Sequence, residues 1–393
     1  MKKKFAFLLM SILLTSCSTN TEIKPSLISK DVDGYLHNGE FIFPLNTITT
    51  LSMYYKDKFD EVYPSFNEMV ISLSKQMDRY NDYDSLVNLK TINDSCGTNQ
   101  TISVSNELFE IVSLAVKLTK LTEGRFNLAM GNIIDLYSPI FESGVEESSL
   151  PSQELIDNAL SSIPSYTEID EIVELDSENK TIKLNQYNES NVVISLGAIA
   201  KGFVMQKAYE YLKGYGYDFL FDSGSSTIAM YGKNQLKESG DWTIGFYNPS
   251  LEKSNEYLSI ITLTGENYLS TSGDYQQKFF YEDENNNKKL MHHIVDPSTG
   301  ISNDYLRSIS LISNNCSLAV LDALSTTLFN VENDNQLNEM VILFEETFNT
   351  KINYVACKKA SDNNYNDVNL IINKDLKSSL NSFASNVKNV TYK

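Results

Sequence analysis

The sequence predicts an α+β fold for a chain of 393 residues. Helical and strand-like segments are mixed, the second half is rich in short strands, and no strict strand–helix–strand alternation is visible. The length allows one large domain or two ordinary ones, and no boundary is evident after residue 40. We therefore expect one domain over residues 40–393, with mixed, mostly antiparallel sheets and packed helices.

The first elements of this domain are a strand and two helices. Residues 41–55 alternate in a strand-like way, and residues 60–80 follow a helical pattern. Ser105 is placed to cap a further helix that ends near Gly124. One face of that helix is apolar and carries Leu108, Ile111, Val112, Ala115 and Leu118.

The middle of the chain predicts a surface excursion followed by short elements. Residues 140–165 are acidic and rich in serine, a composition typical of an exposed segment. A strand pair is expected within residues 169–184, and a short strand at 192–196. A glycine-containing turn then leads into a helix from about residue 202 to residue 212.

The remainder of the chain is rich in strands. Residues 282–289 predict the charged loop of a hairpin, and Ser317 begins another helix that runs through Leu328. Strands are expected at residues 219–222, 227–231, 242–247, 257–264 and 291–295.

The chain is strongly acidic, with 51 acidic against 32 basic residues and a formal net charge of −19. Such a field repels nucleic acid and anionic lipid, so neither is expected as a partner. An anionic small molecule would need a local cation or a metal ion in order to bind.

The N-terminus has the pattern of an export signal. Three lysines precede an apolar segment, residues 5–14, that is too short to span a bilayer. Leu14-Thr15-Ser16-Cys17 resembles the bacterial lipobox, which is cut before a cysteine that becomes lipid-modified. We expect residues 1–16 to be a signal peptide and residues 17–39 a lipidated Cys17 with a polar tether. The protein would then sit on the outer face of a bacterial membrane; a plain secretory signal is the alternative.

The other three cysteines give no sign of a metal site. Cys96, Cys316 and Cys357 form no CxxC pair, and no cysteine–histidine spacing fits zinc. We expect structural or incidental cysteines, and one disulfide, which an exported protein could form, is the alternative.

Two of the three histidines precede a compact turn, His292-His293-Ile294-Val295-Asp296-Pro297-Ser298-Thr299-Gly300. Proline fixes φ at the second turn position, aspartate caps the turn, and glycine adds conformational freedom. A histidine held at such a turn is well placed to act on a ligand. The alternative is a strand end with a stacked histidine pair.

A second candidate is the run Ser195-Leu196-Gly197-Ala198-Ile199-Ala200-Lys201-Gly202. A helix opens near Lys201, and free amides at a helix start beside an ammonium group suit a phosphate or pyrophosphate. The run is neither a Walker A loop nor GxGxxG. A glycine-containing helix start with a surface lysine remains the alternative.

A third candidate is the pair Asp322 and Thr326, four residues apart on one otherwise apolar helix face. A carboxylate buried there needs a partner, and a hard cation with oxygen ligands is one. An aspartate satisfied by the backbone or by a lysine is the alternative. Mg²⁺ usually takes few protein ligands and completes its shell with water and substrate phosphates.

Two weaker signals are polar turns. Thr271-Ser272-Gly273-Asp274-Tyr275 follows a strand, and Thr122-Glu123-Gly124-Arg125-Phe126-Asn127 follows a helix. Each segment, taken alone, predicts an ordinary surface turn. No GxSxG elbow is present, which argues against a Ser-His-Asp hydrolase.

Taken together and in order, these segments resemble the FAD:protein FMN transferases, also known as ApbE-like lipoproteins. The similarity covers about residues 40–335 and adds Asp78-Arg79-Tyr80 and Asn88–Asn93 to the motifs above. It implies an α+β fold of the T-fold type. It also implies Mg²⁺-dependent cleavage of the substrate FAD, attachment of FMN through a phosphoester to a threonine of an acceptor flavoprotein, and release of AMP.

The resemblance also implies roles for individual residues. The metal would be held by the backbone carbonyl of Ala198, the Asp322 carboxylate and the Thr326 hydroxyl, with His293, Asp322 and Lys201 as catalytic residues. Contacts to FAD are implied for Leu45, Tyr80, Arg125, Phe126, Asn127, Ser195, Lys201, Ser272, Gly273, Asp274, His293 and Ile294.

Three departures from the family pattern bear on activity. Ser195 stands where an aspartate is usual, Gly224-Ser225-Ser226 replaces Gly-Gly-Asn, and Leu45 lies where methionine is common. Two alternatives therefore accompany the transferase: a Mg²⁺-dependent FAD pyrophosphatase that gives FMN and AMP, and a flavin-binding lipoprotein with weak or no catalysis.

Overall fold

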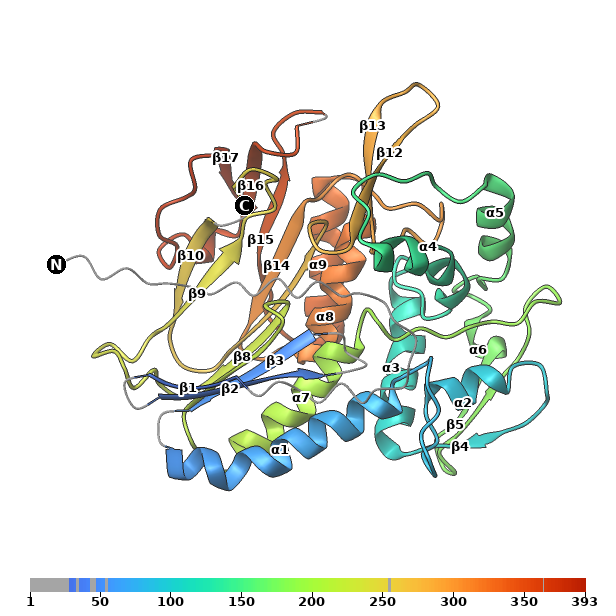
Figure 1. Cartoon of the computed structure of the whole chain (residues 1–393), viewed down its shortest axis with the longest axis horizontal. Coiled ribbons are helices and arrows are strands. Elements are labelled where there is room, and N and C mark those ends of the chain that lie inside the picture. Colours follow the sequence, from blue (N-terminus) through green and yellow to red (C-terminus); the bar gives the residue numbers. More distant parts are fainter. Residues whose placement is uncertain (1–27, 33–34, 43–46, 54–55, 254–255, 363) are drawn as a thin grey trace.

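The computed structural model describes residues 28–32, 35–42, 47–53, 56–253, 256–362 and 364–393. Helices and largely antiparallel strands are mixed in it, which confirms the predicted α+β class (Figure 1). The expected signal peptide, the lipid site Cys17 and the expected flavin contact Leu45 lie outside the described residues.

A ten-stranded sheet forms the centre of the fold, in the order β1-β2-β3-β7-β8-β11-β14-β15-β16-β17. Neighbouring strands pair antiparallel, except for the parallel pair β16 and β17. The strands are β1 Ile28–Val32, β2 Tyr35–Ile42, β3 Thr47–Met53, β7 Phe219–Ser223, β8 Thr227–Tyr231, β11 Asn267–Gly273, β14 Ser308–Ser313, β15 Asn353–Lys359, β16 Val368–Ile372 and β17 Val387–Tyr392.

Helices cover one face of this sheet. α7 contacts β7 and β8, and α8 contacts β11 and β14, while α1 lies against α7 (Figure 1). The largest apolar core fills this interface and includes Phe219, Phe221 and Leu311. The helices on this side are α1 Lys56–Gln76, α3 Asn106–Leu121, α7 Ala200–Lys213, α8 Leu318–Thr327 and α9 Asp334–Phe348.

The opposite face of the sheet carries a two-stranded hairpin, β9 Trp242–Tyr247 with β10 Tyr257–Leu263. Trp242, Phe246 and Leu258 pack there against the outward side chains of the central strands in a second core. The period-2 alternation of β11 explains the separation, because Tyr268 belongs to the first core and Leu269 to the second.

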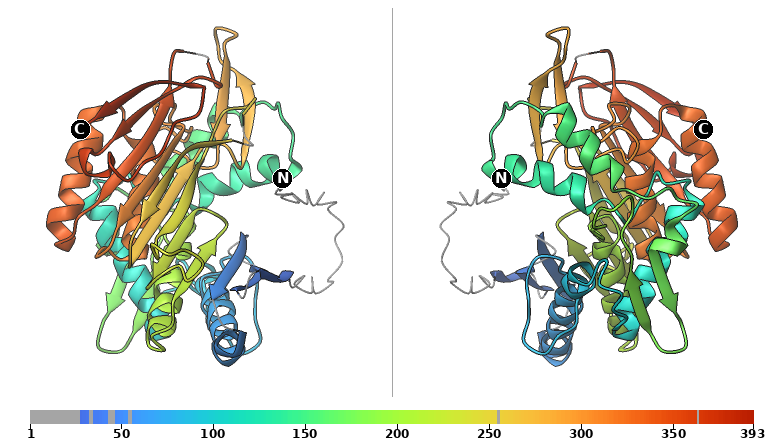
Figure 2. Two further views of the ribbon diagram at one scale, coloured as in Figure 1. Left: turned by 90° about the vertical axis from the view of Figure 1, so that its left-hand side faces the viewer. Right: turned by 90° about the vertical axis from the view of Figure 1, so that its right-hand side faces the viewer.

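A third, smaller core lies under the hairpin of β12 Lys278–Glu282 and β13 Lys288–His292, which projects from one end of the molecule (Figure 2). Phe279 and Met291 of this hairpin pack against Tyr137 and Ile156 from α4 Gly131–Ser143 and α5 Gln153–Ser161. The remaining elements are α2 Leu89–Asp94, α6 Ile169–Ile172, β4 Ile102–Ser103, β5 Val173–Asp176, β6 Thr181–Leu184, η1 Leu328–Asn330 and η2 Lys374–Leu376.

Most of the expected elements are confirmed. The Ser105 hydroxyl accepts a hydrogen bond from the Leu108 amide at the start of α3, and α7, α8 and the hairpin loop after β12 lie where the sequence places them. No helix in the described part of the chain is both long and apolar enough to cross a bilayer.

Two local expectations are wrong. Residues 192–196 form no strand, because their backbone pairs with isolated groups: the Asn93 side chain binds both backbone groups of Ile194, and Ser195 N donates to Leu128 O. The strand expected at residues 291–295 ends at His292, where the chain enters the turn. Residues 140–165 are mostly exposed, as expected, and also contain the helix α5, whose Ile156 is buried.

Candidate functional site

The site is organised where the N-terminal halves of α7 and α8 pack against each other, which we call the crossing. Asp322 in α8 accepts a hydrogen bond at Oδ2 from the backbone N–H of Gly202 in α7, at 2.9 Å. The Ser270 hydroxyl of β11 lies 3.4 Å from the other carboxylate oxygen. Glycine is required at 202, since a Cβ there would lie 2.3 Å from the Leu318 carbonyl oxygen.

The Ala198 carbonyl lies next to this crossing. α7 begins at Ala200, so the Gly202 amide is one of the first-turn amides that find no acceptor within the helix. Asp322 accepts from this amide, and within the described residues the Ala198 carbonyl, just before the N-cap, accepts no backbone hydrogen bond. The fold therefore places the Asp322 carboxylate beside the start of α7, and the Ala198 carbonyl lies just before that start.

The third expected metal ligand, Thr326, lies one turn beyond Asp322 and is half-buried. Its hydroxyl is 3.5 Å from the Ser272 hydroxyl, which in turn lies 2.8 Å from that of Ser325. Ser325 donates to the Asp322 carbonyl at 2.9 Å. Ser272 is thus linked to the candidate metal ligands through hydroxyl contacts.

A row of buried hydroxyl residues underlies this cluster. Thr49, Ser223, Thr227 and Ser270 stand directly opposite one another across β3, β7, β8 and β11, and all four are buried. The Thr227 hydroxyl oxygen has no hydrogen-bond partner in the described structure. Sequence reasoning missed this row, although strand alternation already places Ser270 and Ser272 on one face.

Electrostatics at the crossing favour a bound cation and a bound anion side by side. Burial raises the pKa of the Asp322 carboxyl, while the Lys201 charge and the Gly202 amide act in the opposite direction. Lys201 is half-buried and forms no ion pair with any residue that the structure describes. A buried carboxylate and an unpaired ammonium group both gain from a ligand that carries charge.

The two histidines of the turn have different environments. His293 is half-buried, and its Nδ1 atom is buried without a partner among the described residues. Burial, followed by the nearby charges of His292 and Lys201, lowers the pKa of His293 to about 3. The imidazole is therefore neutral at physiological pH, and one ring nitrogen is available as an acceptor.

Both ring nitrogens of His292, in contrast, form hydrogen bonds within the protein. Its Nε2 lies 2.9 Å from the Asn303 carbonyl, to which it donates, and Nδ1 accepts from the Ile294 amide at 3.3 Å. Burial lowers the pKa of His292 to about 4, and its ring packs edge-on against Phe329 of η1. His292 therefore holds the turn, and the amide of the expected flavin contact Ile294 is already paired.

The loop after α3 is fixed by its own polar groups. The Thr122 hydroxyl accepts from the Phe126 amide at 3.0 Å, and the Asn127 side chain binds Ala129 N and Pro164 O. Phe126 is buried. The side chain of Asn330 in η1 donates to the Arg125 carbonyl at 2.9 Å, which ties this loop to the end of α8.

Tyr80 is exposed and Ser195 is half-buried. Tyr80 is 55% exposed, and the guanidinium group of Arg79 lies 4.3 Å from its ring centroid. Arg79 is held in turn by Asp135 of α4. Ser195 is half-buried, and its hydroxyl makes no hydrogen bond to another described residue.

Asp274, an expected flavin contact, is engaged in a buried ion pair with Arg307. Arg307 also donates to the carbonyls of Pro249 and Tyr365, each at 2.7 Å. Burial raises the pKa of Asp274, and the Arg307 charge opposes that rise. One carboxylate oxygen of Asp274 has no partner in the described structure. Gly273, also an expected contact, is buried against the ring of Tyr275.

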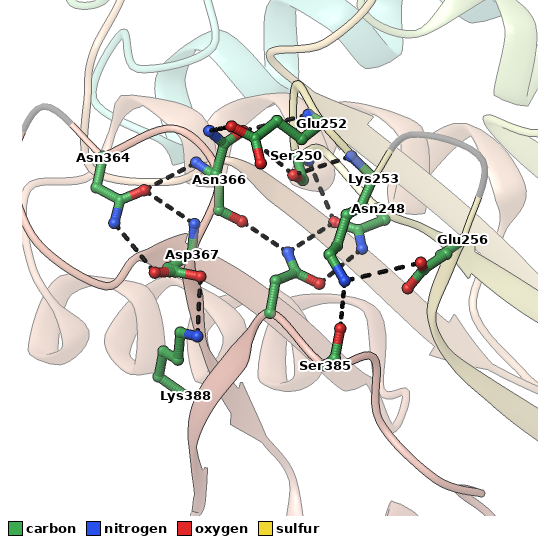
Figure 3. Close-up of polar contacts among 11 residues, drawn as sticks. Asn248, Ser250, Glu252, Lys253, Glu256, Asn364, Asn366, Asp367, Ser385 and Lys388 are labelled. Carbon is green, nitrogen blue, oxygen red and sulfur yellow. Dashed lines mark hydrogen bonds and ion pairs between the residues drawn. The ribbon is translucent and has the colours of Figure 1, made fainter.

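The two segments that supply these carbonyls are joined by a polar network (Figure 3). Asn366 binds the Ser250 hydroxyl and Glu252 through its side chain, and Asn364 binds the amides of Asn366 and Asp367. The network holds the carbonyls of Pro249 and Tyr365, which bind Arg307. Arg307 in turn pairs with Asp274, the residue that follows β11.

The donor set suits Mg²⁺ better than a softer metal. No group of three or more His, Cys, Asp or Glu side chains that could hold a metal occurs in the described residues. The candidate ligands are instead one carboxylate, one carbonyl and one hydroxyl, all hard oxygen donors. Mg²⁺ commonly takes one or two carboxylates and fills its octahedron with water and phosphate oxygens.

Residues 45–341 match the ApbE family. A protein of Haemophilus influenzae named FAD:protein FMN transferase is 28% identical over 251 residues, which cover 63% of this chain and 67% of the relative. A Treponema pallidum protein of the same name is 25% identical over 72% of this chain and 76% of its own length. The chain spans 63% of the length of a third such relative, from Vibrio cholerae.

Solved structures agree on the fold. The flavin transferase ApbE of Vibrio cholerae superposes with a TM-score of 0.64 at 18% identity, covering 91% of this chain and 99% of that one. The ApbE protein of Thermotoga maritima gives 0.63 at 22% identity, covering 85% and 94%. The family match takes in well over half of the residues, and this chain belongs to the ApbE family.

Proposed function

We propose that this protein is an FAD:protein FMN transferase that uses Mg²⁺ to move FMN from FAD to a threonine hydroxyl of an acceptor protein. The observation that carries the proposal is the crossing of α7 and α8. There the buried Asp322 accepts from Gly202, the Ala198 carbonyl is left unused, and Lys201 has no ion-pair partner among the described residues. The names of the relatives support the same reaction.

In this proposal the pyrophosphate of FAD lies at the start of α7. Lys201 binds the anionic oxygens of the pyrophosphate through its ammonium group and its backbone amide. That amide makes no backbone hydrogen bond to a described residue, whereas the neighbouring amides of Ala200 and Gly202 already donate to protein oxygens. Asp322, the Ala198 carbonyl and Thr326 would hold Mg²⁺, which would supply charge neutralisation on the bridging and leaving oxygens. Ser195, Tyr80 and the loop from Arg125 to Asn127 would contact the rest of FAD.

The reaction replaces the phosphoanhydride bond of FAD by a phosphoester bond to the acceptor threonine. The threonine oxygen attacks the phosphorus on the FMN side, the bond from that phosphorus to the bridging oxygen breaks, and AMP leaves with the bridging oxygen. His293 accepts the hydroxyl proton at a ring nitrogen. Its pKa is lowered partly by Lys201, so a pyrophosphate bound to Lys201 would offset that charge and make His293 a better base.

The decisive experiment incubates the protein with FAD, Mg²⁺ and a peptide that bears a threonine acceptor. A fluorescent peptide adduct with stoichiometric AMP supports the transferase. Free FMN and AMP without an adduct would instead assign the pyrophosphatase, and intact bound FAD would assign a flavin-binding protein. Asp322→Ala should abolish AMP release, and undiminished release would refute the metal role.

We also propose that the mature protein is anchored by lipid on Cys17, at the outer face of a bacterial cell membrane. The lipobox-like Leu14-Thr15-Ser16-Cys17 after an apolar segment supports this placement. Cys17→Ala should move the protein from the membrane fraction to the soluble fraction. Retention of the variant in the membrane fraction would remove the lipid anchor from the proposal.

A further inference from the structure

α7 and α8 cap each other. The first amides of a helix have no partner within the helix and need an acceptor from elsewhere. The N-cap residue of α8, Ser317, makes no side-chain cap bond to a described residue. Gln206 of α7 supplies the acceptor instead, because its Oε1 accepts from the Leu318 amide at 2.9 Å.

The reverse contact runs from α8 to α7. Asp322 accepts from Gly202 N at 2.9 Å, so each helix start is capped by a side chain of the other helix. In each helix the two contact residues are one turn apart, which places them on the same face. Gly202 meets both Leu318 and Asp322 with no space for a Cβ. These contacts together fix how α8 is placed along α7.

From this arrangement we infer that Gln206 is a positioning residue for the cation site. The inference rests on the proposed function, in which Asp322 and the Ala198 carbonyl share one metal ion. Gln206 does not touch that site, but it holds Leu318, one turn before Asp322. Without this cap the first turn of α8 loses its only side-chain acceptor in the described structure, and the carboxylate shifts relative to Ala198.

The second contact of Gln206 makes a clean substitution possible. Its Nε2 donates to Glu210 Oε1 at 2.8 Å on the exposed side of α7. Gln206→Met keeps the length of the side chain and removes the acceptor. Gln206→Glu keeps an acceptor for Leu318 N, and repulsion from Glu210 directs the new carboxylate toward the amide.

A control for general stability is available in α9. Asn333 caps that helix by accepting from the amides of Asn335 and Gln336. Asn333→Ala therefore removes a helix cap of the same kind away from the cation site. It should lower the unfolding temperature about as much as Gln206→Met does.

The experiment titrates Mn²⁺ into the full chain saturated with FAD, without an acceptor, and follows binding by electron paramagnetic resonance. Gln206→Met should weaken Mn²⁺ binding about 10-fold, the lower end of the loss seen when groups that orient metal ligands are removed, because Gln206 acts on Asp322 only through Leu318. Gln206→Glu and Asn333→Ala should bind Mn²⁺ like the wild type.

The outcomes separate this inference from the proposed function. If Gln206→Met binds Mn²⁺ like the wild type and only its unfolding temperature falls, the positioning role is overturned while the metal site stands. If the wild type binds no Mn²⁺, or Asp322→Asn binds it equally well, the metal site fails and the inference fails with it.

Discussion

Gly202 donates its backbone N–H to the carboxylate of Asp322 across 2.9 Å, although 120 residues separate the two in the sequence. This one hydrogen bond caps a first-turn amide of α7, close to the Ala198 carbonyl, which accepts no backbone hydrogen bond in the described part of the chain. It also orients the only carboxylate among the expected metal ligands. The candidate chemistry of the protein depends on this contact, and the predictions below test its parts.

Gly202→Ala should separate the two helices. An added Cβ would lie 2.3 Å from the Leu318 carbonyl oxygen and 2.6 Å from the Asp322 Cβ. Overpacking of this kind costs about 1–3 kcal/mol of unfolding free energy, and AMP release should fall with it. Denaturant unfolding measures the cost. Gly214→Ala, at the end of α7 with a helical φ of −58°, is the control and should leave both quantities near the wild type.

Asp322→Asn should stabilise the metal-free protein at neutral pH while it abolishes FMN transfer. Burial raises the pKa of Asp322, so the folded state binds this proton more tightly than the unfolded chain. That contribution is present below the unfolded pKa and is lost as the pH rises through the folded pKa. The asparagine side chain does not ionise, so the variant does not lose this stability as the pH rises. Thermal unfolding against pH should therefore show a gain that shrinks toward acid; a variant less stable at neutral pH contradicts the idea.

The stability of the protein should fall between about pH 6.5 and pH 4 because of His292. Burial lowers its pKa from 6.5 to about 4, so the unfolded chain takes up a proton that the folded ring refuses. The stability is present above the unfolded pKa and is lost as the pH falls through the folded one. A shift of this size corresponds to on the order of 3 kcal/mol. NMR titration of the imidazole resonances would test it, and a His292 midpoint near 6.5 would exclude the mechanism.

Lys201→Met should weaken FAD binding about 10-fold, as the loss of one charge-assisted contact worth roughly 1.5 kcal/mol implies. The fold should be unaffected, since Lys201 forms no ion pair within the described residues. Lys207→Met on the same helix removes an exposed ion pair with Glu110 and serves as the control. Equal FAD affinities for the two variants would place the pyrophosphate elsewhere.

Asp274→Asn distinguishes a flavin contact from a structural ion pair. Removing one partner of a buried pair leaves the other charge uncompensated, which costs about 3–5 kcal/mol. If the Arg307 pair is the main role of Asp274, unfolding free energy falls by that amount and the KM for FAD stays constant in the remaining folded protein. A raised KM at unchanged stability would restore the flavin contact expected from the sequence.

Several features of the site followed from local sequence. Ser105 marks a helix start because its hydroxyl accepts from an amide only three residues further along the chain. The spacing of Asp322 and Thr326 puts both on one helix face, and the proline and glycine of the His293 turn set its shape locally. Helix α5 was missed because Ile156 and Ala159 become buried only when the distant β12–β13 hairpin packs over them.

Other features had no local signal. Gln206 and Asn330 carry no motif, and their roles arise from amides and carbonyls of distant segments. Adjacent His292 and His293 look equivalent in the sequence. Both ring nitrogens of His292 are paired, with Asn303 and Ile294, whereas Nδ1 of His293 has no partner among the described residues.

The sequence by itself determined the fold class, the order of most elements and the residues that carry charge, because helix caps, turns and periodicity are set by near neighbours. Only the tertiary structure decided which of those charges meet. Asp322 is paired with an amide of α7, Lys201 is left beside it, and Asp274 is taken by Arg307, because burial and hydrogen-bond geometry are properties of packed elements and not of any segment alone.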